Sequence, residues 1–122
     1  LKPHAGRYEG GTYNMAGIAG LEASLVWLDG LGIEQIESKI LEITGHLCEK
    51  LTAIGGLVSS NRTPEHSSGI VSFEMPGQSP RELMRTCRDR DVVINCRDGR
   101  LRASPHAYSN RDDVDRLIDV LS

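Results

Sequence analysis

Residues 92–104 read VVINCRDGRLRAS. The pair Asp98-Gly99 is typical of a tight turn, because both residues of such a turn adopt positive φ. Strand-forming residues flank it, from Val92 to Cys96 on one side and from Leu101 to Ser104 on the other. The stretch therefore predicts a β-hairpin.

Two more strands and a helix are predicted before this hairpin. Residues 57–60 form a short strand pattern, and residues 70–75 are rich in strand formers between a glycine and a Pro-Gly pair. Ser79-Pro80-Arg81-Glu82 has the form of a capping box with proline at the first helical position. It predicts a helix over about residues 80–90.

Three further helices complete the pattern. Apolar residues three and four apart predict a helix over residues 14–29 with one buried stripe, formed by Ile18, Leu21, Leu25 and Leu28. The same spacing predicts a longer helix over residues 33–54. Asn110 can cap a final helix, since Asp112 and Asp113 then fall in the first turn, where the helix dipole favours acidic residues.

The resulting order, α-α-β-β-α-β-β-α, predicts an α+β fold. We expect a small antiparallel or mixed sheet of about four strands, covered by helices, with a long leading helix. Long strand–helix–strand alternation is absent, which excludes a doubly wound dinucleotide-binding sheet. We divide the chain into a linking loop and helix, residues 1–31, and an α+β domain, residues 32–122.

Composition narrows the function classes. The 122 residues are 39% apolar and 25% charged, as in a globular domain. A net charge of -3 and an aromatic content of 4% give no basic field and few stacking groups, so we expect no nucleic-acid partner. No apolar run approaches the roughly 18 residues of a membrane span, so we expect no membrane partner.

Cysteines and histidines show no ligand pattern. The three cysteines lack a Cys-x-x-Cys pair, and the four histidines lie at least 20 positions apart. We therefore expect neither a disulfide framework nor a metal site, and a reducing, cytoplasmic location. Cys48 and Cys87 fall beside apolar residues and are predicted to be buried, while Cys96 has no histidine near it in sequence that could act as a base.

Two motifs could bind anions. Gly10-Gly11-Thr12 precedes a predicted helix, where backbone N–H groups and a hydroxyl suit a phosphate; an ordinary loop is the alternative. Arg97 and Arg102 flank the hairpin turn. A strand arginine beside small residues can present its planar fork to a carboxylate, although a surface ion pair fits the spacing equally well.

Three stretches, in this order, carry a resemblance to a known family. They are residues 7–14 (RYEGGTYN) with the small-residue helix after them, residues 68–73 (SGIVSF), and residues 101–110 (LRASPHAYSN) with the helix after them. Together they resemble the C-terminal part of class V aminotransferases, which are pyridoxal-phosphate enzymes of fold type I.

The resemblance implies roles for four residues. Gly11 and Thr12 would contact the phosphate of pyridoxal 5′-phosphate, in the partner subunit of a homodimer. Arg102, with Arg97 nearby, would bind the carboxylate of an amino-acid substrate. Family members carry the Schiff-base lysine in a large N-terminal domain, so the resemblance implies that this chain has no catalytic residue and is not catalytically competent alone. The parent protein would be an aminotransferase-like enzyme.

The hairpin predicts a subgroup. Cysteine desulfurases and selenocysteine lyases of this class place a long loop with a reactive cysteine between the two strand arginines. Only residues 98–101 separate Arg97 from Arg102 here. We therefore expect a closer resemblance to aminotransferase-like and epimerase-like members. The alternative is a stand-alone α+β module that binds a small anionic ligand or a protein partner; nucleic-acid binding by the arginine cluster is a distant third.

Overall fold

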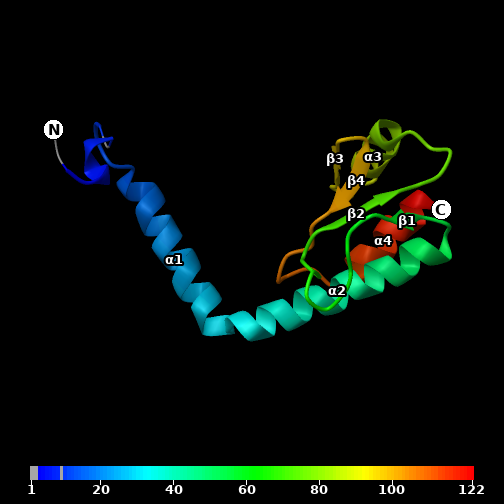
Figure 1. Ribbon diagram of the computed structural model, residues 1–122, viewed down its shortest axis with the longest axis horizontal. Helices are drawn as coiled ribbons and strands as arrows, with labels where there is room; N and C mark the ends of the chain where they lie inside the picture. The colour runs from blue at the N-terminus through cyan, green and yellow to red at the C-terminus, as the bar shows by residue number, and fades with distance from the viewer. Residues whose placement is uncertain (1–2, 9) are drawn as a thin grey trace. The chain divides into compact units, whose positions relative to one another are not determined.

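The computed structural model describes residues 3–8 and 10–122. Contacts between Cα atoms divide the chain into two compact units, Leu1–Ile33 and Glu34–Ser122. Figure 1 shows the elements of both. The assignment of residues 1–31 and 32–122 to two functional parts stays a prediction.

The first unit holds a short 3-10 helix, η1 (Ala5–Arg7), and α1 (Met15–Leu31), close to the helix predicted over residues 14–29. Asn14 caps α1, because its Oδ1 accepts a hydrogen bond from the backbone N–H of Gly17 at 2.9 Å. A Cβ on Gly17 would lie 2.6 Å from Asn14 Nδ2. The cap therefore requires glycine at this position.

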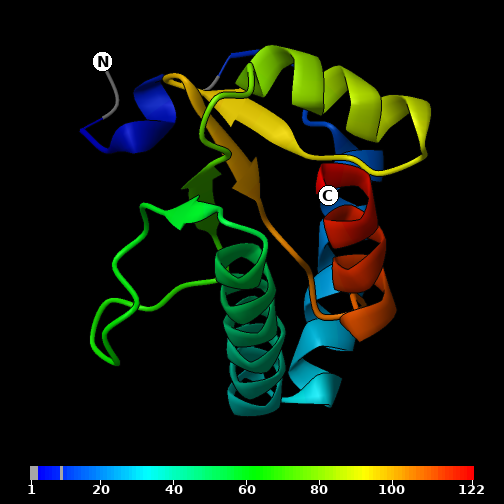
Figure 2. The same ribbon diagram turned by 90° about the vertical axis from the view of Figure 1, so that its right-hand side faces the viewer.

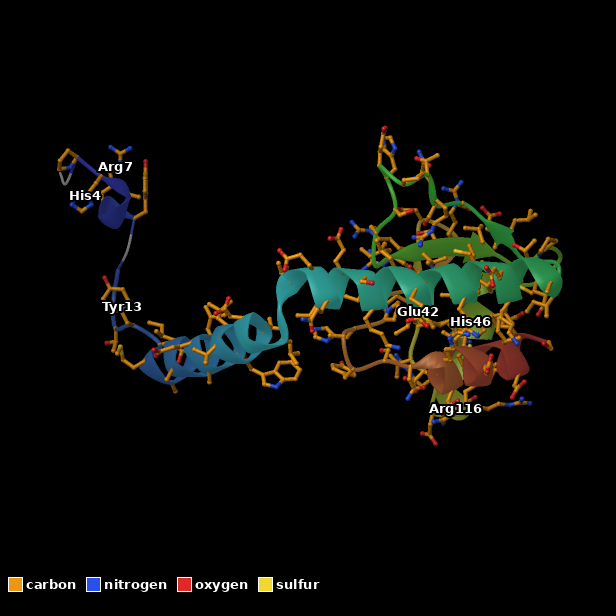
Figure 3. All side chains as sticks on the ribbon, turned by 90° about the horizontal axis from the view of Figure 1, so that it is seen from below. His4, Arg7, Tyr13, Glu42, His46 and Arg116 are labelled. Atoms are coloured by element: carbon orange, nitrogen blue, oxygen red, sulfur yellow. The ribbon has the colours of Figure 1, made fainter. Side chains whose placement is uncertain are left out.

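The predicted burial of an apolar stripe on α1 is wrong for this chain. No residue of α1 is buried, and side chains project from several sides of this helix (Figure 3). A stripe is buried only against an opposing apolar surface, and in the described part of its own unit α1 is accompanied only by the short η1. Its exposed large apolar residues are Met15, Ile18, Leu21, Leu25, Val26, Trp27 and Leu31.

No single helix among residues 3–8 and 10–122 is both long enough and apolar enough to cross a membrane. Taken together as a bent pair, α1 and α2 (Ile33–Ala53) pass that test by length and composition alone, which is weak evidence.

The second unit is built on a four-stranded sheet. Its strands are β1 (Leu57–Val58), β2 (Val71–Glu74), β3 (Asn95–Arg97) and β4 (Arg100–Ala103), in the order β1-β2-β4-β3. Every neighbouring pair is antiparallel. The predicted α+β fold with a small sheet of four strands is confirmed.

Helices α2, α3 (Pro80–Asp89) and α4 (Arg111–Leu121) complete this unit (Figure 2). Their apolar residues meet one side of the sheet in a single core. The largest fully buried side chains come from α2, β2, β4 and α3: Ile43, Thr44, Leu47, Leu51, Val71, Phe73, Cys87 and Leu101.

The two predicted N-caps of this unit behave differently. Asn110 and Asp113 form a complete capping box at the start of α4, as the Asn110 cap predicts. The predicted box at Ser79 is wrong, because the Ser79 side chain makes no capping hydrogen bond. Pro80 at the first helical position already fixes a helical φ, so α3 begins there without a side-chain cap.

The hairpin forms around the predicted turn, but its first strand is shorter than expected. Asp98 and Gly99 have φ of 51° and 76°, the left-handed conformation of a two-residue hairpin turn. Residues 92–94 lie outside the strand. The backbone N–H of Val92 donates to the carbonyl of Cys87 at 2.8 Å, which closes α3 and removes this donor from the sheet.

We predict opposite effects for two glycine-to-alanine substitutions. Gly99→Ala places a side chain in the left-handed region and should destabilise the fold by about 1 kcal/mol. Gly45→Ala lies inside α2 with no atom within 4 Å of the added Cβ, and should stabilise it by about 0.5–1 kcal/mol. Urea unfolding followed by circular dichroism measures both, and equal effects would contradict the turn geometry.

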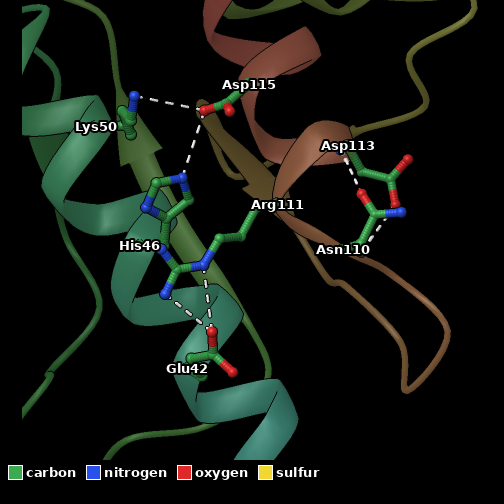
Figure 4. A network of polar contacts seen from close by, with 7 residues as sticks. All are labelled: Glu42, His46, Lys50, Asn110, Arg111, Asp113 and Asp115. Carbon is green, nitrogen blue, oxygen red and sulfur yellow. Dashed lines mark hydrogen bonds and ion pairs between the residues drawn. The ribbon is translucent and has the colours of Figure 1, made fainter.

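Charged side chains join α2 to α4 (Figure 4). The Nε and Nη2 atoms of Arg111 donate to Glu42 Oε1 at 3.2 and 2.9 Å. One and two turns further along α2, His46 Nε2 and Lys50 Nζ lie 3.4 and 3.5 Å from Asp115 Oδ1. The hydrogen bond from Arg111, with the charge of nearby Lys39, lowers the pKa of Glu42.

Because the pKa of Glu42 is lowered in the folded state, its ionised carboxylate stabilises the fold at pH values above the ordinary pKa of a carboxyl group. This stabilisation is lost as the pH falls through the pKa that Glu42 has in the folded state. We expect Glu42→Gln to reduce the melting temperature at pH 7, with the difference from the unmodified chain shrinking as pH falls below about 4.5. Glu49→Gln, on an exposed part of the same helix, is the control. A difference that is independent of pH would contradict the Glu42–Arg111 pairing.

Candidate functional site

One side of the sheet carries three arginines, and we call this side the arginine face. Strand register places Arg102 between Ser72 on β2 and Asn95 on β3, and Arg97 directly opposite Arg100. Since side chains alternate across a strand, these groups share one face, while Leu101 and Ala103 point into the core. The arginine face consists of Ser72, Glu74, Asn95, Arg97, Arg100 and Arg102.

Arg102 is partly buried and has no acidic partner. Among residues 3–8 and 10–122 it makes no hydrogen bond and no ion pair, and its Nε atom is shielded from solvent without an acceptor. A buried N–H group without an acceptor costs about 1–3 kcal/mol. An acceptor from outside the described residues would satisfy this N–H group.

The other two arginines differ in their partners. Arg100 Nε donates to Glu74 Oε1 at 2.9 Å, so its charge is paired. Arg97 Nε lies 3.9 Å from Asp98 Oδ2, beyond hydrogen-bond distance, and both side chains are largely exposed, at 73% and 94%. An exposed pair at this distance contributes little free energy. Two cationic groups, on Arg97 and Arg102, thus remain available on the arginine face.

Sequence reasoning found the two arginines but missed their neighbours. Ser72, Asn95 and Glu74 reach the arginine face through pairing of strands that are up to 30 positions apart. The Asp98-Gly99 turn fixes the register of β3 against β4, so the pairing of Asn95 with Arg102 could have been found from the sequence. The pairing with β2 could not, since no short turn connects β2 to β4.

The cysteines lie away from the arginine face. Cys96 pairs with Leu101 and packs against the core, on the opposite side of the sheet. Cys87 is buried, as predicted, whereas Cys48, also predicted to be buried, is only half-buried; burial raises the pKa of both thiols. No thiol of this chain faces Arg102.

The predicted phosphate loop belongs to the first unit. Gly11 has a φ of 93°, no atom lies within 4 Å of a Cβ built on it, and Thr12 is exposed. An open loop with a left-handed glycine and a free hydroxyl, placed before the capped start of α1, has donors suited to a phosphate. The residues present therefore fit the phosphate end of pyridoxal phosphate. Glu9, in the stretch that carried the family resemblance, lies outside the described residues.

Neither lysine in the described part of the chain is placed for covalent chemistry. Lys39 Nζ lies 3.6 Å from Glu42 and Lys50 Nζ 3.5 Å from Asp115, on the outer surface of α2. Lys2 lies outside the described residues. Within residues 3–8 and 10–122, no group of three histidines, cysteines or acids could hold a metal ion.

A cleft of about 460 Å³ lies elsewhere in the second unit. Its walls combine apolar residues of α2, α4 and the segment 92–94, such as Ile43, Val92 and Leu117, with polar and charged residues such as Asp91, Asp113 and Arg116. It contains no residue of the arginine face.

Comparisons with known proteins find relatives that are described as cysteine desulfurases. A probable cysteine desulfurase of Xylella fastidiosa (strain 9a5c) is 31% identical over 132 residues, covering 98% of this chain and 31% of the relative. Among solved structures, the apo cysteine desulfurase of Thermococcus onnurineus NA1 superposes with a TM-score of 0.88 at 24% identity, covering 98% of this chain and 33% of that one. The Escherichia coli cysteine desulfurase CsdA gives 0.79 at 25% identity, covering 92% and 31%.

These relatives correct one prediction. The expected closer resemblance to aminotransferase-like and epimerase-like members is not supported, because the similar proteins are cysteine desulfurases. This chain resembles desulfurases although the loop between Arg97 and Arg102 is short. The length of this loop therefore did not predict the subgroup. The chain spans about a third of the length of the curated relatives that it matches.

The family is shown by a match along nearly the whole chain. The model of the family described as "Aminotransferase class-V" matches residues 1–117. Relatives of this class depend on pyridoxal phosphate, which confirms the predicted cofactor. The chain belongs to the class-V aminotransferase family.

Proposed function

We propose that this chain is the C-terminal, substrate-binding part of a pyridoxal-phosphate enzyme that acts on an amino acid, and that Arg102 binds the substrate carboxylate. The observation that carries the proposal is the partly buried Arg102 guanidinium, whose Nε has no acceptor. A planar guanidinium binds a carboxylate through two parallel hydrogen bonds. Within the same chain, Arg111 binds the Glu42 carboxylate through Nε and Nη2, which both donate to Oε1.

Gly11 and Thr12 would hold the cofactor phosphate in the proposed enzyme. The open backbone of Gly11 and the exposed Thr12 hydroxyl supply the donors. When bound, pyridoxal phosphate supplies an electron sink for the bonds at the substrate Cα. In the proposed homodimer, this loop serves the site of the partner subunit, as in the family that the sequence resembles.

A large domain completes the proposed enzyme and carries the lysine. Its presence is supported by relatives about three times as long as this chain and by the apolar surface of α1. Apolar helices that bury nothing within their own chain are typical of interfaces. We propose that α1 is covered by this large domain or by the partner subunit, and that the enzyme is cytoplasmic, in agreement with its three free thiols.

The cysteine positions limit what the proposed enzyme does with sulfur. Cys96 faces the core, and Cys48 and Cys87 are held in apolar surroundings. If the substrate is cysteine, as for the desulfurases that this chain resembles, the acceptor for its sulfur lies outside this chain.

The test uses the full-length protein, encoded with the sequence upstream of Leu1. Arg102→Gln removes the charged partner of the carboxylate and should raise KM for the amino acid about 100-fold, which corresponds to a loss of about 3 kcal/mol. The absorbance of bound cofactor should not change, because Arg102 contacts the substrate only. Arg102→Lys should restore part of the affinity, since it returns the charge without the fork.

Arg88→Gln is the matched control, because Arg88 is an exposed arginine on α3 away from the arginine face. An unchanged KM in Arg102→Gln would contradict the proposal. Tight binding of an amino acid by the 122-residue chain alone would favour the stand-alone binding module instead.

A further inference from the structure

We propose that Arg97 is a specificity-determining residue which selects amino acids whose side chains end in a second anionic group, such as a carboxylate. This inference rests on the proposed function of Arg102 and adds a second point of contact to it.

The two guanidinium groups are spaced for one small substrate. Asn95 on β3 is paired with Arg102, so Arg97, two residues further along β3, is the diagonal neighbour of Arg102 on the same face. Diagonal neighbours in a sheet have Cα atoms roughly 7–8 Å apart, and long side chains reach across this distance. A side chain of two or three carbons separates two anionic groups by less than that, so both guanidinium groups can contact one molecule.

Arg97 is free to accept such a group, unlike Arg100. The contact with Asp98 is 3.9 Å long and joins two solvated side chains, so little free energy opposes its replacement. Arg100 is occupied by Glu74 at 2.9 Å. Because Glu74 neutralises Arg100, the second anionic group of the substrate binds to Arg97.

The groups beside Arg102 carry no charge. Ser72 and Asn95 flank it on the neighbouring strands, and neither side chain makes a hydrogen bond within residues 3–8 and 10–122. They can donate to the first carboxylate without repelling it. The arginine face as a whole therefore holds two unneutralised positive charges, which match a substrate with two negative ones better than a substrate with one.

The test compares L-glutamate with L-glutamine, which have nearly the same shape and differ in side-chain charge. The full-length protein of the preceding test, labelled with ¹⁵N, is titrated with each at constant ionic strength, and the Nε–H resonances of its arginines are followed by NMR. We expect both ligands to shift the Arg102 resonance, with glutamate binding about 10-fold more tightly. In Arg97→Gln this preference should fall below about 2-fold, while Arg88→Gln should retain it.

The outcomes separate this inference from the proposed function. Equal affinity for the two ligands, with Arg102 responding to both, overturns the role of Arg97 and leaves the proposed function standing. A preference that falls equally in Arg88→Gln also overturns it, because the effect then comes from net charge. Failure of Arg102 to respond to either ligand overturns both. The spectrum of each variant reports directly that it is folded.

Discussion

Phe73→Ala should destabilise the second unit by about 3–5 kcal/mol. Phe73 lies on the inner strand β2, is completely buried, and faces Leu101 of β4 across the sheet. Its removal leaves a cavity in the core. The helices α2, α3 and α4 could fill this cavity only by moving, and that movement would break their contacts with the sheet. A domain of this size has a total stability of about 5–15 kcal/mol, so the variant should unfold at a much lower urea concentration.

Leu57→Ala is the matched control for Phe73→Ala. Leu57 lies in the same sheet but on its outer side, 58% exposed, and its truncation should change stability by no more than about 0.5 kcal/mol. Urea unfolding of both variants, followed by circular dichroism, measures the difference. Similar losses in the two would show that the core does not centre on Phe73.

Thr44→Val should cost about 1.5–3 kcal/mol, the second largest effect on stability that we expect. Thr44 is completely buried on α2, where its Oγ1 accepts a hydrogen bond from Arg62 Nη2 at 2.7 Å. Arg62 Nη1 also donates to the carbonyl of Ser68 at 2.8 Å, so this side chain ties the loop before β2 to α2. Valine fills the same space but cannot accept the bond.

Thr52→Val is the control, because Thr52 lies on the same helix with an exposed hydroxyl that donates only to the carbonyl of Cys48. It should change stability by no more than about 0.5 kcal/mol. A double-mutant cycle with Arg62→Met isolates the Thr44–Arg62 term. If the two substitutions were additive in the cycle, the bond would contribute nothing to the fold.

The hairpin and the long helix could be predicted from the sequence because their signals are local. Asp98-Gly99 specifies positive φ at both turn positions, and the structure has it at both. The apolar period of α2 yields a helix from Ile33 to Ala53, with Ile43, Leu47 and Leu51 buried. Asn110 likewise caps α4 through contacts that span three residues.

The wrong predictions concern segments whose structure depends on another part of the chain or on an opposing apolar surface. Residues 92–94 have a strand pattern, but Val92 N–H is taken by the end of α3. Ser79 has the sequence of a cap, but Pro80 already fixes the start of the helix. The apolar stripe of α1 has the right period for burial and buries nothing in this chain.

The candidate site shows the same division. The two anion-binding candidates, Gly11-Thr12 in the first unit and Arg97 with Arg102 in the second, were visible in the sequence, since glycine conformation and arginine charge are properties of the residues themselves. Their roles stay predictions. Which arginine is neutralised was not visible, because Glu74 reaches Arg100 across a strand pair separated by 26 positions.

By itself, then, the sequence determined the helices, the turn and the class of fold, because these follow from periodicity and backbone preference over a few residues. Only the tertiary structure decided that Arg100 is paired while Arg97 and Arg102 are available, and that Cys96 faces the core and not the arginine face. The reason is that charge pairing and side-chain burial depend on strand register, which brings together residues far apart in the chain.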